Sequence, residues 1–516
     1  MNVLNAKYQK MKNIKYIFIL TLVSIVGCSD LEENPISVLS PDGFYQSSRD
    51  VQTTINGCYG NMTEEAFWGR KLSLPLMLRS DMVGIGDVGT ASRRIDHDNF
   101  TVNADNGMIT AFWPRTYQII AGANEAIAGA SKISESEDIL NPITAQAYFV
   151  RAYTYFHLVR LFGDIPYIDN PVDNIEAAKN ISKTPATEVY TKIIADLEYA
   201  KQWLPDVQSS RSLPSKATAA GYLALVHLTM NEFDKAYTEA KFVIDNESRF
   251  DLVLADDFQD LFDATKQDGL KESLFEIDYN GFRDGNYGTD YQPALTGIRA
   301  NQRGDIGGGW SVAVPNVEVY NRWDGRDYRK AVSLDTTAVF AGVEEPFMNF
   351  PNFDSRNIAS PYIAKYTRLI GLSAQGNGRA SQLNYAQLRY AEVLLIAAEA
   401  LNEINPGSAE ADGYINRVRA RARNQAGTIT VFPADVTPGM SQEAFRDMVL
   451  EERKWELAFE CKRWYDIKRR QLGDEVFSAS GIEQRPNFSA SRDYLLPLPS
   501  DELLRNSNLE PNNPGY

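Results

Sequence analysis

The sequence has little cysteine and little histidine, with three residues of each among 516. Three cysteines are too few for a disulfide framework in a chain of this length, and they favour no cysteine-based zinc site. His97, His157 and His227 are far apart, and none stands in the HExxH spacing of metalloproteases. We therefore predict no metal site and no cofactor.

Long apolar runs are also missing after residue 30, where none reaches the roughly 18–20 residues that a membrane helix needs. The sequence contains no phosphate loop, dinucleotide fingerprint or Gly-x-Ser-x-Gly elbow. Its 68 acidic residues leave a glycosidase-type pair of carboxylates open as an alternative, but no segment singles out such a pair. The protein is thus predicted not to be an enzyme.

Basic residues are outnumbered, with 52 Lys and Arg against 68 Asp and Glu. The first 27 residues hold four lysines and no acid, so the remainder carries a net charge of −20. Such a surface repels phosphate backbones, and no basic block offsets it. We expect no nucleic-acid partner.

The N-terminal segment is typical of an export signal. Residues 16–26 (YIFILTLVSIV) form an apolar stretch that follows basic residues and is too short to span a membrane. Met11 would open a complete leader by itself, so translation from Met1 or from Met11 both stay open. The leader ends at Cys28 in a pattern that resembles the lipobox of bacterial lipoproteins, and residues 29–33 (SDLEE) resemble a surface-export signal. This predicts a signal peptide over 1–27, lipidation of Cys28 and anchorage in an outer membrane, facing the cell exterior.

Most of the remaining chain reads as helical hairpins. Apolar residues recur at helical spacing and stop at Gly or Pro, and Asn231 to Ala236 (NEFDKA) resembles the turn of a tetratricopeptide repeat. The helices expected on this basis cover residues 148–162, 186–204, 216–230, 234–245, 385–403 and 409–424. Each hairpin leaves an apolar face open, so stacking into a mostly α scaffold with long irregular loops and few short strands is expected.

Residues 246–380 differ from these helical regions. Within them, residues 280–310 contain eight glycines, two tyrosines and one tryptophan, without helical periodicity. So long an irregular stretch in a folded protein is often functional. Together with the leader, this divides the chain into 1–27, 28–245, 246–380 and 381–516, with 246–380 as a loop-rich ligand-binding insertion.

Several blocks together resemble the SusD/RagB family of nutrient-binding outer-membrane lipoproteins. These blocks are residues 147–168 (AYFVRAYTYFHLVRLFGDIPYI), 388–395 (LRYAEVLL), 415–422 (INRVRARA), 451–460 (EERKWELAFE), 462–469 (KRWYDIKR), 494–499 (YLLPLP) and 513–516 (NPGY). They occur in the family's order, although Cys461 stands where the family usually has glycine. The resemblance implies a tetratricopeptide-like scaffold that acts without catalysis as a lid on a SusC-like, TonB-dependent transporter. Arg453, Trp455 and Trp464 in these blocks are expected to support the scaffold rather than to contact ligand.

The resemblance also implies a shallow glycan site built from loops, with a contribution from an early segment. Sugar rings present apolar C–H faces and hydroxyls, so aromatic platforms beside polar side chains suit them. The predicted ligand-binding residues are Trp68, Arg79, Asp81, Asn286, Tyr287, Asp290, Tyr291 and Trp310. For Trp68 and Trp310, burial in the core remains an equal alternative.

The predicted function is therefore capture of an oligosaccharide or polysaccharide and its delivery to the transporter. A peptide ligand, as in RagB-type members, is the first alternative, because aromatic clefts with Asp and Arg suit either ligand. A secreted glycoside hydrolase and a purely structural scaffold are further alternatives. The sequence identifies neither the glycan nor its linkage and length.

Overall fold

Helices dominate the computed structural model, which describes residues 41–172, 174–285, 287–303, 308–353, 359–373 and 378–516. The chain divides into two units, Met1–Gln46 and Ser47–Tyr516. The described part of the first unit contains the short helix α2 (Pro41–Phe44). The predicted leader and Cys28 lie outside the described residues.

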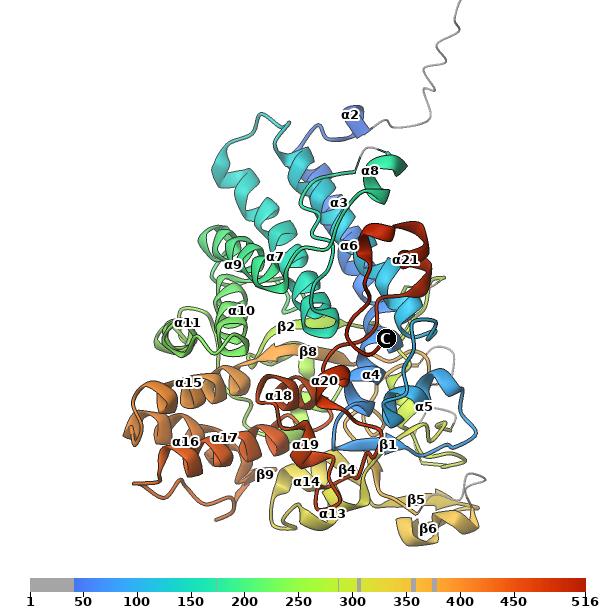
Figure 1. Cartoon of the computed structure of the whole chain (residues 1–516). Helices are drawn as coiled ribbons and strands as arrows, with labels where there is room; N and C mark the ends of the chain where they lie inside the picture. The colour runs from blue at the N-terminus through green and yellow to red at the C-terminus, as the bar shows by residue number, and fades with distance from the viewer. Residues whose placement is uncertain (1–40, 173, 286, 304–307, 354–358, 374–377) are drawn as a thin grey trace, which may run out of the picture. The chain divides into compact units, whose positions relative to one another are not determined.

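The long helices of the second unit pack in succession (Figure 1). They are α3 (Ser48–Met62), α6 (Ile109–Ala130), α7 (Glu137–Phe162), α9 (Ala186–Trp203), α10 (Lys216–Thr229), α11 (Phe233–Asp245), α15 (Tyr390–Ile404), α16 (Ala409–Ala422) and α17 (Gln442–Glu456). Each helix from α3 to α16 contacts the next one in this series, and α17 contacts α15. The contact of α11 with α15 joins the two helical blocks across the intervening insertion. The predicted mostly α, tetratricopeptide-like scaffold is confirmed.

The remaining helices are short. The α-helices are α4 (Ser73–Leu78), α5 (Ser92–Asn99), α8 (Ile175–Lys179), α12 (Gln292–Thr296), α13 (Val317–Arg322), α14 (Tyr328–Ser333), α18 (Arg463–Arg469), α19 (Gly473–Val476), α20 (Ala490–Asp493) and α21 (Ser500–Arg505). A π-helix, η1 (Glu65–Leu72), leads into α4. The 3-10 helices are η2 (Phe258–Phe262), η3 (Gln267–Gly269), η4 (Phe347–Asn352) and η5 (Ser507–Leu509).

The described strands form antiparallel pairs rather than a larger sheet. The pairs are β1 (Val83–Ile85) with β3 (Ala313–Pro315), β2 (Ser273–Asp278) with β8 (Asn384–Arg389), β4 (Leu334–Asp335) with β7 (Tyr362–Ile363), β5 (Thr337–Phe340) with β6 (Val343–Pro346), and β9 (Asn424–Gln425) with β10 (Thr428–Ile429). The β2–β8 pair corrects one prediction, because residues 385–389 were expected to be helical. Their partner strand lies more than a hundred residues earlier in the chain, and helical periodicity does not report it.

One large buried cluster joins the regions distinguished in the sequence, and smaller buried clusters around Phe340 and Phe258 lie within the insertion. The cluster of buried residues runs from Cys58 to Leu498 and includes residues of the insertion such as Phe275 and Trp323. The insertion is therefore built into the scaffold. Its predicted role in ligand binding remains a prediction.

The most specific sequence block, residues 451–460, builds a buried ion-pair network. Glu456 is fully buried and accepts hydrogen bonds from Arg329 at 3.0 Å, from Arg389 at 2.5 Å and from Arg421. Burial raises the pKa of Glu456, but the positive charges of these arginines outweigh it and hold the pKa well below its ordinary value. The network ties α17 to α14, β8 and α16.

The neighbouring motif residues also belong to the scaffold, as predicted. Arg453 is buried and pairs with Glu392 at 3.0 Å and with Asp466 at 2.9 Å. Trp464 is buried, and Trp455 stacks on another tryptophan, Trp323, with 4.7 Å between ring centroids. Arg453 and Trp464 are thus covered by the scaffold, and Trp455 is part exposed beside its stacking partner.

Candidate functional site

The early segment and the glycine-rich loop lie against each other, as predicted. The Tyr291 amide donates to the Gly69 carbonyl at 3.0 Å, and the Gly288 amide donates to the Thr63 hydroxyl at 3.2 Å. A Cβ atom on Gly69 would lie 2.0 Å from the Thr289 carbonyl oxygen. Since no real Cβ approaches another atom so closely, position 69 requires glycine for this contact. The close approach fixes residues 287–292 on η1.

Tyr291 and Trp310 form an aromatic pair on this foundation. Their ring centroids are 5.6 Å apart with planes at 61°, an edge-to-face arrangement. Tyr291 is mostly covered, whereas Trp310 is part exposed. The Trp310 amide donates to the Ala294 carbonyl at 2.7 Å, so the tryptophan is held against α12. Trp310 is thus the accessible ring of the pair, and the covered Tyr291 supports it.

Arginines surround the aromatic pair. The guanidinium carbon of Arg70 lies 4.4 Å from the centroid of the Tyr291 ring, and that of Arg379 lies 5.3 Å from the Trp310 centroid. Arg299 donates to the Trp310 carbonyl at 2.9 Å. Such cation–π contacts and donors create a site with both stacking and hydrogen-bonding capacity.

Two carboxylates take part in the same arrangement. Glu65 forms an ion pair with Arg70 and lies 3.6 Å from the Lys71 ammonium, while Asp87 lies 3.3 Å from Arg299. We use the name Tyr291–Trp310 cluster for Glu65, Arg70, Asp87, Arg94, Tyr291, Arg299, Trp310 and Arg379.

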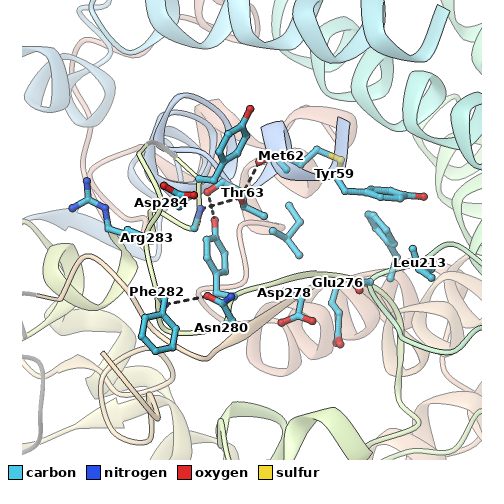
Figure 2. Close-up of a pocket in the computed structure, with 17 residues that line it drawn as sticks. Tyr59, Met62, Thr63, Leu213, Glu276, Asp278, Asn280, Phe282, Arg283 and Asp284 are labelled. Carbon is cyan, nitrogen blue, oxygen red and sulfur yellow. Dashed lines mark hydrogen bonds between the residues drawn. The ribbon is translucent and has the colours of Figure 1, made fainter. Parts of the chain in front are cut away.

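A separate pocket of about 450 Å³ opens beside the end of β2 (Figure 2). Its lining includes Tyr59 and Met62 of α3 and the loop residues Asn280, Phe282 and Tyr287. Phe282 and Tyr287 are about half exposed, at 57% and 49%. The Asn280 side-chain oxygen accepts from the Phe282 amide at 3.0 Å, which shapes the rim of the pocket. The pocket therefore combines aromatic surface with polar groups.

An unusual carboxyl group lines the same pocket. Glu276 and Asp278 project on the same side of β2 (Figure 2), as alternate residues of a strand do. Burial and the negative charge of Asp278 raise the pKa of Glu276 to about 7. Glu276 accepts a hydrogen bond from the Asn384 amide at 3.1 Å, so it also links β2 to β8.

The predicted ligand residues fall into three groups. Tyr287 lines the pocket, and Tyr291 and Trp310 meet in the cluster. Asn286 lies outside the described residues. The others, Trp68, Arg79, Asp81 and Asp290, are buried, at 4%, 1%, 1% and 0% exposure.

Arg79 and Asp81 are corrected to structural residues. The Arg79 guanidinium lies between the rings of Trp464 and Phe100, with its carbon 4.6 Å and 4.7 Å from their centroids. It also donates a hydrogen bond to the backbone carbonyl of Asp493. Asp81 accepts two hydrogen bonds from Arg463, both at 2.8 Å. Apart from Phe100, their partners are hundreds of residues away in the chain, so the local sequence gave no sign that both would be covered.

Asp290 is likewise corrected from a ligand contact to a support of the loop, and for Trp68 the alternative of burial in the core is confirmed. Asp290 accepts hydrogen bonds from the hydroxyls of Ser381 at 2.6 Å and Tyr385 at 2.7 Å. Burial raises the pKa of Asp290 to about 6. Trp68 packs against Tyr385, with 6.2 Å between ring centroids. Both residues hold the loop on β8 without facing outward.

The predicted ligand-binding residues leave out six members of the cluster, namely Glu65, Arg70, Asp87, Arg94, Arg299 and Arg379. Arg70 is next to the glycine that contacts the loop, so its position after Trp68 was the available signal. Arg379 follows Gly378, whose carbonyl accepts a hydrogen bond from the backbone amide of Ala294 in α12 at 3.0 Å. Only that tertiary contact identifies Arg379.

No helix in the ranges given above is both long and apolar enough to cross a membrane. In those same ranges, no three or more His, Cys, Asp or Glu side chains gather in a way that would hold a metal ion.

Comparisons with known proteins cover nearly the whole chain. Residues 352–516 match the model of the SusD family, and residues 38–228 match a family described as "Starch-binding associating with outer membrane". SusD-like protein P2 of Formosa agariphila is 57% identical over 508 residues, which span 98% of this chain and 100% of that protein.

Solved structures share the fold at lower identity. A SusD homolog from Bacteroides thetaiotaomicron superposes with a TM-score of 0.79 at 20% identity, covering 92% of this chain and 98% of the other. Surface glycan-binding protein A from Bacteroides thetaiotaomicron, solved in complex with laminarihexaose, gives 0.74 at 20% identity, covering 90% and 99%. At such identities the likeness shows the fold alone.

Proposed function

Because this chain belongs to the SusD family, we propose that it captures an oligosaccharide or polysaccharide at the cell surface. It then delivers the glycan to a SusC-like, TonB-dependent transporter of the outer membrane, without catalysis. Family membership supports this role.

The observation that carries the proposal is the Tyr291–Trp310 cluster. A part-exposed tryptophan backed by a tyrosine gives a pyranose ring a rigid apolar platform at small entropic cost. Arg299 and Arg379 stand beside that platform and supply hydrogen-bond donors for hydroxyl or acidic groups. Tyr287 and the neighbouring pocket offer a second aromatic surface for a longer glycan.

We further propose that acylated Cys28 anchors the protein in the outer membrane, with its body facing the cell exterior. The leader and the acidic residues 29–33 support this address. The matched family described as associating with the outer membrane supports it as well.

Glycoside hydrolysis is the alternative that the pocket raises. A carboxyl group whose pKa is about 7 holds a proton near neutral pH, as a general acid must. However, Glu276 is buried and hydrogen-bonded to Asn384, which makes strand pairing its evident role. A peptide ligand, as in RagB-like proteins, remains the alternative within the same type of importer.

The test is a binding screen of the purified full-length chain in detergent by affinity electrophoresis. The panel contains plant, host and microbial polysaccharides and a peptide mixture, with Trp310→Ala as the paired variant. Binding of a glycan, weakened in the variant, is expected. Peptide binding alone would move the protein to the RagB-like alternative, and release of reducing ends from a bound glycan would favour hydrolysis. Binding of neither class would contradict the proposed capture role.

A further inference from the structure

Positive charge gathers around the aromatic pair of a protein whose formal net charge is −16. Arg70 lies on one side of Tyr291 and Arg379 lies near both rings, 5.8 Å from the Tyr291 centroid. Arg299 is bonded to the backbone of Trp310. The cationic group as a whole comprises Arg70, Lys71, Arg93, Arg94, Arg299 and Arg379.

Five of these cations, Arg70, Lys71, Arg93, Arg94 and Arg299, are only partly neutralised by protein carboxylates. Across the described part of the chain, Glu65 and Asp87 are the carboxylates within ion-pair distance of these five. The Nε donors of Arg70, Arg93, Arg94 and Arg299 are buried and have no hydrogen-bond acceptor among the described residues. The surroundings of Tyr291 are therefore rich in donors and poor in acceptors.

Together with burial, mutual repulsion among these cations lowers the pKa of two of them, Arg94 and Lys71. Burial and the nearby charges of Arg70 and Arg93 lower the pKa of Arg94 to about 10. Burial and the charge of Arg70 likewise lower the pKa of Lys71 to about 8. A bound anion would relieve this repulsion, because it supplies the opposite charge.

We propose that the Tyr291–Trp310 cluster binds an acidic sugar unit, one that carries a carboxylate or a sulfate ester. This inference rests on the proposed function and narrows its ligand class. The ring of the sugar stacks on Trp310 while its anionic group is held by arginines, whose planar fork matches carboxylate and sulfate oxygens. The acidic remainder of the protein does not prevent this, since charges beyond about 8 Å are largely screened at physiological ionic strength.

The experiment measures affinities of the purified full-length chain by calorimetry for four probes. Polygalacturonate carries carboxylates alone, κ-carrageenan carries sulfates alone, a β-1,3-glucan is neutral, and polyglutamate is an acidic non-sugar. The variants are Arg379→Gln and Arg93→Gln, both at part-exposed positions. Arg303→Gln is the matched control, because Arg303 is an exposed arginine of the same loop that pairs with Glu344 at 3.1 Å, outside the cluster. Thermal unfolding of each variant checks that it folds.

The expected result is binding of polygalacturonate or κ-carrageenan at least tenfold tighter than of the neutral glucan. Arg379→Gln or Arg93→Gln weakens binding of the acidic polysaccharide about tenfold, whereas Arg303→Gln leaves this affinity unchanged. The affinity of the wild-type protein falls as NaCl is raised from 50 to 300 mM. The first two probes then tell carboxylate from sulfate. Preference for the neutral glucan, unaffected by the arginine variants or salt, would overturn this inference and leave the proposed glycan capture intact. Binding of polyglutamate alone, or of no probe together with no glycan in the wider screen, would overturn both.

Discussion

The guanidinium of Arg70 packs over the ring of Tyr291, its carbon 4.4 Å from the ring centroid. This contact joins the π-helix η1 to a loop more than two hundred residues later in the chain. The Tyr291 amide, which donates to the carbonyl of Gly69, makes the same connection through the backbone. The candidate site therefore depends on how closely these two segments approach.

Replacing Gly69 tests that approach. In Gly69→Ala the new Cβ would lie 2.0 Å from the Thr289 carbonyl oxygen, so the loop must shift away from η1. We expect a loss of about 1–3 kcal/mol in the free energy of unfolding and weakened glycan binding. Denaturant unfolding and calorimetry measure the two effects.

The matched control is Gly57→Ala, in the middle of α3, where an added Cβ meets nothing within 4 Å. Alanine is favoured over glycine in a helix interior, so this variant should gain about 0.5–1 kcal/mol and bind normally. Equal behaviour of the two variants would argue against the close contact.

The carboxyl of Glu276 predicts a pH dependence of stability. Its pKa is raised from 4.5 to about 7 on folding, mainly by burial. The contribution of the protonated carboxyl to the free energy of unfolding is fully present below pH 4.5 and is lost as the pH rises through 7. Between these two pH values the carboxyl loses its proton in the unfolded state but keeps it in the folded state. The loss amounts to about 3 kcal/mol.

Glu276→Gln should remove this part of the pH dependence and make the protein more stable than wild type at pH 8. Denaturant unfolding at pH 4.5, 6 and 8 measures it. Asp501→Asn, at an exposed position 3.8 Å from Arg505, is the control and should leave the profile unchanged. An unaltered profile for Glu276→Gln would show that the carboxyl does not hold its proton in the folded state.

The buried network at Glu456 predicts a large cost for removing one charge. Glu456→Gln leaves Arg329, Arg389 and Arg421 without their shared carboxylate in a buried site. Breaking a buried ion pair from one side costs about 3–5 kcal/mol. Guanidinium unfolding should report this loss, whereas Glu176→Gln, which breaks the exposed pair with Lys179, should change stability by less than about 1 kcal/mol. A small effect at Glu456 would mean that the arginines are neutralised in another way.

Membrane attachment through Cys28 is tested by cell fractionation. Cys28→Ala cannot be acylated, so the protein should leave the membrane fraction, while Cys58→Ala should remain there because Cys58 is buried in the scaffold. Retention of Cys28→Ala in the membrane at the wild-type level would rule out the lipid anchor.

Local periodicity predicted the scaffold well and the site only in part. Residues 186–204 were expected to be helical, and α9 covers Ala186–Trp203, because a repeating apolar stripe and a terminal Pro205 are local signals. Residues 385–389 were assigned wrongly because their strand pairs with β2. Such pairing is a tertiary property.

The same reason explains the mixed outcome at the site. The glycine-rich composition of the loop drew attention to Tyr291 and Trp310, and their rings are in contact in the structure. Arg79 and Asp81 looked like surface polar residues, yet distant partners near the C-terminus cover them. For Arg379, proximity to Trp310 follows only from the folded chain.

The most direct test of glycan capture at the Tyr291–Trp310 cluster is calorimetric titration of one bound glycan into wild type, Trp310→Ala and Tyr287→Ala. Trp310 supplies the accessible ring of the cluster, whereas Tyr287 belongs to the neighbouring pocket. Capture at the cluster predicts that Trp310→Ala weakens binding tenfold or more, as loss of an aromatic anchor does, and that Tyr287→Ala has the smaller effect. Wild-type affinity in Trp310→Ala with loss of binding in Tyr287→Ala would contradict it and assign the site to the pocket.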